Sequence, residues 1–132
     1  MCPEMICSPA TPLDRACFAV GTRFRLHGRD VESGLDCVGL IAFAYDRAEA
    51  PTGYSLRGGT CEGWAAFLDG FAVRRAGPAQ AGDIILLHAG PAQFHLGLWS
   101  GMSLIHADAG LRRVVELPGW PVWPVVGVWR AP

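Results

Sequence analysis

The pattern of hydrophobic and polar positions changes once along the chain, near residue 82. Before that point, apolar residues recur at helical spacing, which predicts helices over residues 12–20, 37–48 and 61–73. After it, short apolar runs alternate with turn residues, as is typical of strands. The predicted strands cover residues 84–88, 94–99, 102–107, 112–117 and 125–129. Helices followed by a meander of strands indicate an α+β fold, with the helices packed on one side of an antiparallel sheet of about five strands.

The starts of two predicted helices carry capping signals. Thr11 is a candidate N-cap followed by Pro12 at the first helical position, and Asp36 is well placed to cap the helix that begins at Cys37. Ahead of the first helix, the chain has no basic residue and no apolar run of the length that a secretory signal needs. We therefore expect residues 1–11 to be a loose leader and residues 12–132 to form a single domain.

Composition narrows the classes of function. The chain has 132 residues, of which 51% are hydrophobic and 17% charged, which suits one globular domain. The formal net charge is -1, so no general electrostatic field attracts nucleic acid or an anionic membrane surface. The longest apolar runs fall far short of the roughly 20 residues that a membrane-spanning helix needs. We expect no nucleic-acid partner, no membrane insertion and no cofactor.

The cysteines and histidines form no recognisable disulfide framework or zinc motif. The cysteines are odd in number and lack a C-x-x-C pair, and the histidines lack zinc-finger spacing. They lie at positions 2, 7, 17, 37 and 61 and at positions 27, 88, 95 and 106. We expect free thiols and a reducing compartment. A zinc ion on Cys37, His95 and His106 would lack a carboxylate with motif spacing, so no metal site is expected.

Cys37 is a candidate nucleophile because of its place at the first turn of a predicted helix. The positive end of the helix dipole and the unpaired N–H groups there favour a thiolate over a thiol. Asp36 opposes this by its charge. Its expected role is therefore to cap the helix or to hold a cationic group of a substrate.

A hairpin brings two of the histidines together. If Ser100 and Gly101 form a two-residue turn, the numbers of each cross-strand pair sum to 201, and His95 then lies opposite His106. Directly opposite Cβ atoms lie about 4.5 to 5.5 Å apart, close enough for one ring to orient the other. A slip of one residue would instead put the two rings on opposite faces of the sheet.

These three residues fit the requirements of a thiol peptidase. Cys37 would supply a thiolate, one imidazole would take and return its proton, and the second would fix the tautomer of the first. The backbone N–H of Cys37 could hold an oxyanion at the helix end. On spacing alone, ordinary core packing of the three residues stays open as an alternative. His27 and His88 are expected to be a surface residue and a strand terminus.

Six short segments together resemble the NlpC/P60 family of cysteine peptidases, and within it the phage-type and gene-transfer-agent cell-wall peptidases. The resemblance covers about residues 13–132 and rests on the order and spacing of the segments. They are Gly21-Thr22-Arg23-Phe24, Asp36-Cys37-Val38-Gly39-Leu40, Ala81-Gly82-Asp83-Ile84, His95-Leu96-Gly97-Leu98, Ile105-His106-Ala107 and Trp129-Arg130-Ala131-Pro132.

The resemblance implies a papain-like core and a role for each of the three residues. Cys37 would be the nucleophile, His95 the general base and His106 the orienting residue. The implied reaction is hydrolysis of amide bonds in peptidoglycan stem peptides, typically between D-glutamate and a diamino acid. At two positions next to this site the chain departs from the family. Phe24 replaces a tyrosine whose hydroxyl is thought to help hold the oxyanion, and Val38 replaces a serine that often helps bind the free end of the stem peptide.

Two functions of different class follow from these features. The first is a peptidoglycan endopeptidase, made without a signal peptide and carried at a phage-like tail tip. The second is a catalytically weak or degenerate structural component of a phage or gene-transfer-agent tail assembly. The apolar segment of residues 118–124, with three prolines and two tryptophans, would in either case line a groove, dock a partner protein or cover the sheet edge.

Overall fold

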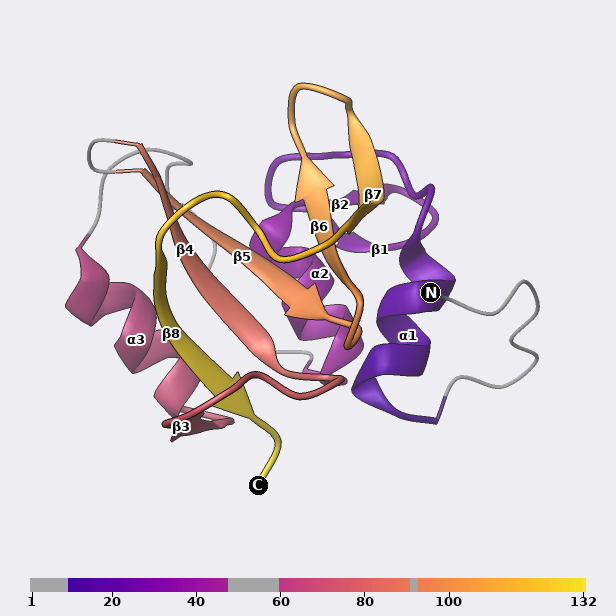
Figure 1. Cartoon of the computed structure of the whole chain (residues 1–132). Helices are drawn as coiled ribbons and strands as arrows, with labels where there is room; N and C mark the ends of the chain where they lie inside the picture. Colours follow the sequence, from indigo (N-terminus) through magenta and orange to yellow (C-terminus); the bar gives the residue numbers. More distant parts are fainter. Residues whose placement is uncertain (1–9, 48–59, 91–92) are drawn as a thin grey trace.

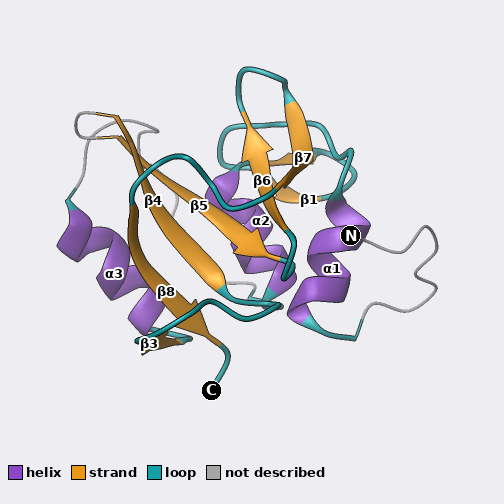
Figure 2. Ribbon diagram, viewed as in Figure 1, coloured by secondary structure: helices purple, strands orange, loops and turns teal. Residues whose placement is uncertain are grey.

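Figure 1 shows a computed structural model of the chain, which describes residues 10–47, 60–90 and 93–132. Three helices precede most of a six-stranded antiparallel sheet whose strand order is β3-β8-β4-β5-β6-β7, and a two-stranded sheet pairs β1 with β2 (Figure 2). The α+β prediction is confirmed. The elements are α1 (Pro12–Ala19), β1 (Arg29–Asp30), β2 (Gly34–Leu35), α2 (Cys37–Ala44), α3 (Cys61–Asp69), β3 (Val73–Arg75), β4 (Ile84–Gly90), β5 (Gln93–Trp99), β6 (Ser103–Asp108), β7 (Arg113–Pro118) and β8 (Val125–Arg130).

The helices begin where the side chains can satisfy their first N–H groups. The Thr11 hydroxyl accepts a hydrogen bond from the backbone N–H of Asp14, and the Thr60 hydroxyl does the same for Gly63. The predicted helix over residues 61–73 is too long, because α3 ends at Asp69 with Gly70 as its C-cap. The chain that follows forms β3, which makes the sheet six-stranded instead of five-stranded.

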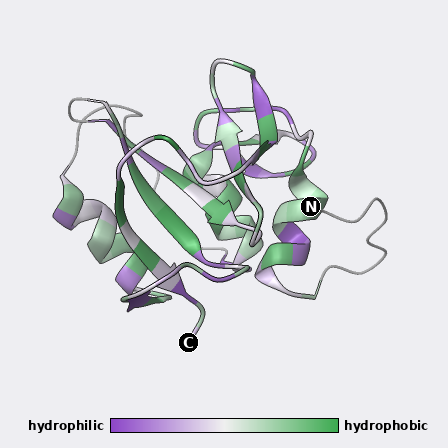
Figure 3. Ribbon diagram, viewed as in Figure 1, coloured by the Kyte–Doolittle hydropathy of each residue, from purple (hydrophilic) through white to green (hydrophobic). Residues whose placement is uncertain are grey.

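The two faces of the sheet have different covers. Alternate strand residues such as Leu86 and Leu96 join the core beneath all three helices, so the helices pack on one side of the sheet as predicted. Their neighbours, such as Leu87 and Trp99, form a smaller cluster on the other face, against Trp123. Figure 3 shows hydrophobic residues concentrated on α2 and the central strands.

The hairpin between β5 and β6 has a different register from the predicted one. Trp99 pairs with Leu104, so a four-residue loop, residues 100–103, replaces the two-residue turn. The Ser100 hydroxyl stabilises this longer loop by accepting a hydrogen bond from the backbone N–H of Ser103 at 2.9 Å. Only two residue pairs connect the strands before they diverge (Figure 1). Both strands also contact α2, so the start of this helix can reach the space between them.

The state of the cysteines differs from the expectation. Cys17 is disulfide-bonded, whereas Cys37 and Cys61 are free. The expectation of free thiols is therefore wrong at Cys17, and Cys2 and Cys7 lie outside the described residues. A disulfide is typical of proteins that reach an oxidising environment, which removes the argument for a reducing compartment.

Two other expectations concern the amino-terminal leader and membrane-spanning helices. The expected leader, residues 1–11, lies outside the described residues except for its last two. In the part of the chain that is described, no helix is long and apolar enough to cross a membrane.

Candidate active site

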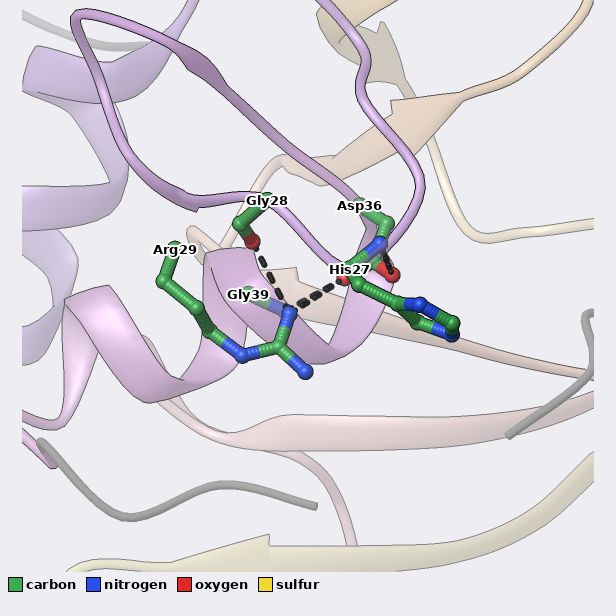
Figure 4. Close-up of polar contacts among 5 residues, drawn as sticks. All are labelled: His27, Gly28, Arg29, Asp36 and Gly39. Carbon is green, nitrogen blue, oxygen red and sulfur yellow. Dashed lines mark hydrogen bonds and ion pairs between the residues drawn. The ribbon is translucent and has the colours of Figure 1, made fainter. Parts of the chain in front are cut away.

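Asp36 fixes the start of α2. Its fully buried carboxylate accepts hydrogen bonds from the backbone N–H of Gly39 at 2.8 Å and of His27 at 2.7 Å (Figure 4). Arg29 adds an ion pair at 3.1 Å and also donates to the carbonyl oxygen of Gly28. The predicted capping role is confirmed. The alternative, a contact with a cationic substrate group, stays a prediction; in this structure the carboxylate is fully buried and does not line the pocket.

Two glycines let the loop before α2 lie directly on the helix. The Gly28 carbonyl oxygen occupies the place where a Cβ on Gly39 would be, and a Cβ on Gly28 would meet the backbone of Gly34. This close approach holds the loop of residues 21–34 against the start of α2. Phe24, on the same loop, thereby becomes a wall of the pocket beside Cys37.

Cys37 is the first residue of α2, and its side chain is only 2% exposed. Burial, followed by the negative charge of Asp36, raises the pKa of the Cys37 thiol to about 12. The backbone amides of Leu96, Val38 and Cys37 itself act in the opposite direction. The prediction of a stabilised thiolate is therefore wrong for this conformation. Burial favours the neutral thiol more strongly than the end of the helix favours the thiolate.

His95 on β5 and His106 on β6 contact each other directly. His95 Nε2 lies 2.9 Å from His106 Nδ1, and the two rings are nearly perpendicular, with centroids 5.0 Å apart. The observed register shifts the pairing by two residues, which keeps both side chains on one face of the sheet. They are thus diagonal neighbours, not directly opposite residues. The prediction that the two imidazoles meet is confirmed, although the register behind it is wrong.

Both imidazoles are neutral at pH 7. Burial, followed by the neighbouring His106, lowers the pKa of His95 to about 4, while Asp108 acts to raise it. Burial also lowers the pKa of His106, again opposed by Asp108. Neither shift favours an imidazolium that could pair with a thiolate.

Trp123 packs against both rings from the apolar segment of residues 118–124. Its ring centroid lies 6.0 Å from that of His95 and 6.0 Å from that of His106, and both contacts are edge-to-face. Trp120 of the same segment packs edge-to-face on Trp99, with its side chain half exposed. This segment therefore lines the candidate site, one of the roles left open by the sequence, and it packs on a face of the sheet at β5 and β6 instead of on a sheet edge.

These side chains surround one pocket of about 190 Å³. It is lined by Phe24, Cys37, Ala89, Gln93, Phe94, His95, His106, Ala107, Asp108, Ala109, Gly110 and Trp123. Cys37 reaches it from the helix side, where β5 and β6 diverge. Within the described residues, no hydrogen bond joins the Cys37 thiol to either imidazole.

Two positions near the pocket differ from the sequence-based expectations. Val38, which replaces the family serine, is fully buried in the core under the helices and is not among the described residues that line the pocket. Asp108 lines the pocket and was not predicted. Its place two residues after His106 on a strand could have indicated it, because alternate strand residues share a face.

Other residues of the segments that resemble NlpC/P60 peptidases stabilise the fold and do not line the pocket. Asp83 is fully buried and forms a two-pronged ion pair with Arg130, at 2.8 and 2.9 Å, which joins the start of β4 to the end of β8. His88, expected to be a strand terminus, is an exposed residue of β4 and stacks on Phe94. No group of three or more His, Cys, Asp or Glu side chains in the described ranges could hold a metal ion.

Comparison with known proteins gives matches among solved structures. No family model matches the chain, and no curated protein matches it. A protein similar to a lipoprotein of the NLP/P60 family from Staphylococcus aureus subsp. aureus Mu50 is 24% identical with a TM-score of 0.60; the alignment covers 96% of this chain but 45% of that one. The NlpC/p60 domain of peptidoglycan hydrolase SagA is 24% identical with a TM-score of 0.59, over 89% of this chain and 96% of that domain. The chain therefore spans less than half of the first protein, and it has the α+β fold of NlpC/P60 domains.

Proposed function

We propose that this chain is a cysteine peptidase that hydrolyses amide bonds between D-glutamate and a diamino acid in peptidoglycan stem peptides. The observation that carries the proposal is the hydrogen-bonded pair of His95 and His106 in the same pocket as Cys37, at the start of a helix. The fold is shared with a domain of a peptidoglycan hydrolase. The bond specificity comes from the resemblance of the sequence segments to NlpC/P60 peptidases.

The hydrogen bond between the rings supports a different role for each ring nitrogen of His95. His95 uses Nε2 to contact His106, so Nδ1 is the nitrogen left to take the Cys37 proton. For Nδ1 to be free, His95 must carry its hydrogen on Nε2 and donate it to His106 Nδ1. His106 would in this way select the tautomer of His95 in which Nδ1 acts as a base.

The reaction then follows the course of a thiol peptidase. As the sulfur attacks the amide carbon, its proton moves to His95 Nδ1 and the C–O π electrons move to oxygen. The backbone N–H of Cys37 would stabilise the oxyanion. When the C–N bond breaks, the leaving amine takes the proton from His95, and water later hydrolyses the thioester. Since the resting thiol is neutral and buried, the side chains around the sulfur must move before it reaches a substrate.

A second candidate function is favoured by that same resting state. Cys37 is almost fully buried, no hydrogen bond joins its thiol to the described imidazoles, and Phe24 lacks a hydroxyl to hold an oxyanion. A degenerate domain that serves as a structural component of a phage or gene-transfer-agent tail would have these properties. A location in a phage-like tail, whether as a peptidase at the tail tip or as a structural component, is supported by the sequence resemblance alone.

Digestion of purified peptidoglycan distinguishes the two candidates. We expect the unmodified chain to release fragments with new D-glutamate carboxyl ends, detected by mass spectrometry, and Cys37→Ala to release none. Cys61→Ala is the matched control, because Cys61 is a free cysteine outside the pocket, and it should keep full activity. If the unmodified chain and Cys37→Ala are equally inactive, the peptidase proposal fails and the structural role is favoured.

A further inference from the structure

Among the described residues that line the pocket, Asp108 is the one carboxylate, and it forms no ion pair with another described residue. We propose that Asp108 forms an ammonium-binding subsite, which selects substrates that carry a positively charged amine close to the amide bond that is cut. The proposal deepens the proposed function and rests on it. It concerns a residue that neither the capping network of α2 nor the proposed proton transfer uses.

The rest of the pocket lining is neutral. Apart from Asp108, it consists of aromatic rings, small apolar residues, one amide, the thiol and the two imidazoles. The lowered pKa values of both histidines keep their rings uncharged at pH 7. The field inside the pocket is therefore negative, and it favours an ammonium group over a carboxylate.

Asp108 differs from the two buried aspartates that have structural roles. Asp36 is paired with Arg29 and Asp83 with Arg130, and both of these carboxylates are fully buried. Asp108 is partly exposed and accepts a hydrogen bond at Oδ1 from the backbone N–H of Leu111, at 2.9 Å.

The basic residue opposite Asp108 in the sheet does not pair with it. Arg113 lies directly opposite it in the ladder between β6 and β7. Nevertheless, these two described residues form no ion pair with each other. A carboxylate in a pocket loses part of its hydration, and an incoming ammonium group compensates for this loss by a charge-assisted hydrogen bond.

The size and walls of the pocket limit what can bind there. A volume of about 190 Å³ holds a group the size of one side chain, so a bound ammonium group would lie near the reacting atoms. Phe24 and Trp123 line the same space, and aromatic rings can stabilise a cation through their π electrons. An aliphatic amine meets these conditions, whereas a carboxylate would be repelled by Asp108.

Two amines in a stem peptide have this chemistry. One is the side-chain ammonium of the diamino acid, and the other is the α-ammonium at the amino end of a trimmed peptide. Both place a cation within a few bonds of the amide that is cut. Asp108 would recognise the charge itself, so the test must separate the two sources.

The test compares dipeptides in which D-glutamate is joined to lysine, a diamino acid. One form has both amines free, a second is acetylated on the α-amine, and a third is acetylated on the side-chain amine. We expect the unmodified chain to lose about tenfold in kcat/KM for one of the acetylated forms, because one charge-assisted contact is lost. The form that loses activity identifies which amine binds.

Asp108→Asn tests whether this carboxylate causes the discrimination. The amide oxygen can still accept from Leu111, so the fold should be preserved. We expect kcat/KM for the doubly free dipeptide to fall about tenfold relative to that for the acetylated form, so that the preference disappears. Asp46→Asn, on an exposed residue outside the pocket, is the matched control and should keep the preference.

Two results would overturn the subsite. If Asp108→Asn lowers kcat/KM equally for free and acetylated dipeptides, Asp108 acts by orienting His106 and not by binding an amine. If it changes neither, the residue has no role. Should no dipeptide and no peptidoglycan be cleaved, the proposed function fails, and calorimetry on the Cys37→Ala chain then tests the subsite alone. Equal affinity for the free and acetylated dipeptides would exclude it.

Discussion

The two sides of the pocket are built in opposite ways. On the cysteine side, Asp36 is fully buried and joins the helix start to the preceding loop, and Cys37 beside it is only 2% exposed. On the histidine side, two strands that pair at only two positions present a His–His hydrogen bond and a carboxylate that forms no ion pair with the described residues. The cysteine side is thus held by a buried polar network, whereas the histidine side has fewer strand-to-strand pairs and more groups open to the pocket.

Removing the anchor of the cysteine side should have the largest effect. Asp36→Ala takes away a helix cap and removes the buried carboxylate that forms an ion pair with Arg29, so we expect a loss of about 3–5 kcal/mol in the free energy of unfolding. Urea unfolding measures it. Asp30→Ala, at an exposed aspartate whose contacts are local, is the control and should cost much less. Equal losses would show that the Asp36 network does not anchor this region.

The histidine side should make the protein sensitive to acid. Below pH 6.5 the histidines of the unfolded chain bind protons, whereas folded His95 does so only near pH 4. The unfolded state therefore binds more protons in this window, and the free energy of unfolding falls as the pH falls, by about 3 kcal/mol at most from His95.

Urea unfolding at several pH values, with two variants, assigns this acid sensitivity. In His95→Gln the decline between pH 6.5 and 4 should be smaller, while His88→Gln, at an exposed position of β4, should keep it. If His95→Gln declines as steeply as the unmodified chain, the buried histidine pair is not the cause of the acid sensitivity.

The same contrast explains what the sequence could predict. The caps at Thr11 and Asp36 depend on residues within one helical turn, so they were identified correctly. The hairpin register depends on Ser100, whose hydroxyl stabilises a four-residue loop. The rule for two-residue turns does not predict such a loop. The histidines still meet, because a shift of two residues preserves the face of a strand.

The protonation state of Cys37 could not be predicted from the sequence. The helix end acts on the thiol locally, but its burial is set by packing against a strand nearly 60 residues later in the chain, around Leu96. Asp108 was missed for a related reason. The role proposed for it depends on its forming no ion pair with the described residues, and only the arrangement of the folded chain reveals that.

Phe24 allows the missing oxyanion donor to be restored. If the pocket is a working but weakened active site, Phe24→Tyr should raise kcat by about 10 to 100 fold, since one oxyanion donor typically contributes 10² or more. Phe18→Tyr, at a half-exposed ring on α1, is the control and should leave kcat unchanged. No gain at Phe24 would mean that a hydroxyl there does not reach the oxyanion.

The smallest expected effect tests how tightly the cysteine side is closed. Because burial raises the pKa of Cys37 to about 12 and leaves its side chain 2% exposed, a small alkylating agent at pH 7 should modify it about tenfold or more slowly than Cys61. Peptide mapping by mass spectrometry gives the two rates separately. Trp123→Ala should speed the modification of Cys37 but not of Cys61, because Trp123 is a wall of the Cys37 pocket. If Cys37 reacts faster than Cys61 in the unmodified chain, its thiolate already forms at rest. The cysteine side of the pocket would then be as accessible to reagents as the histidine side.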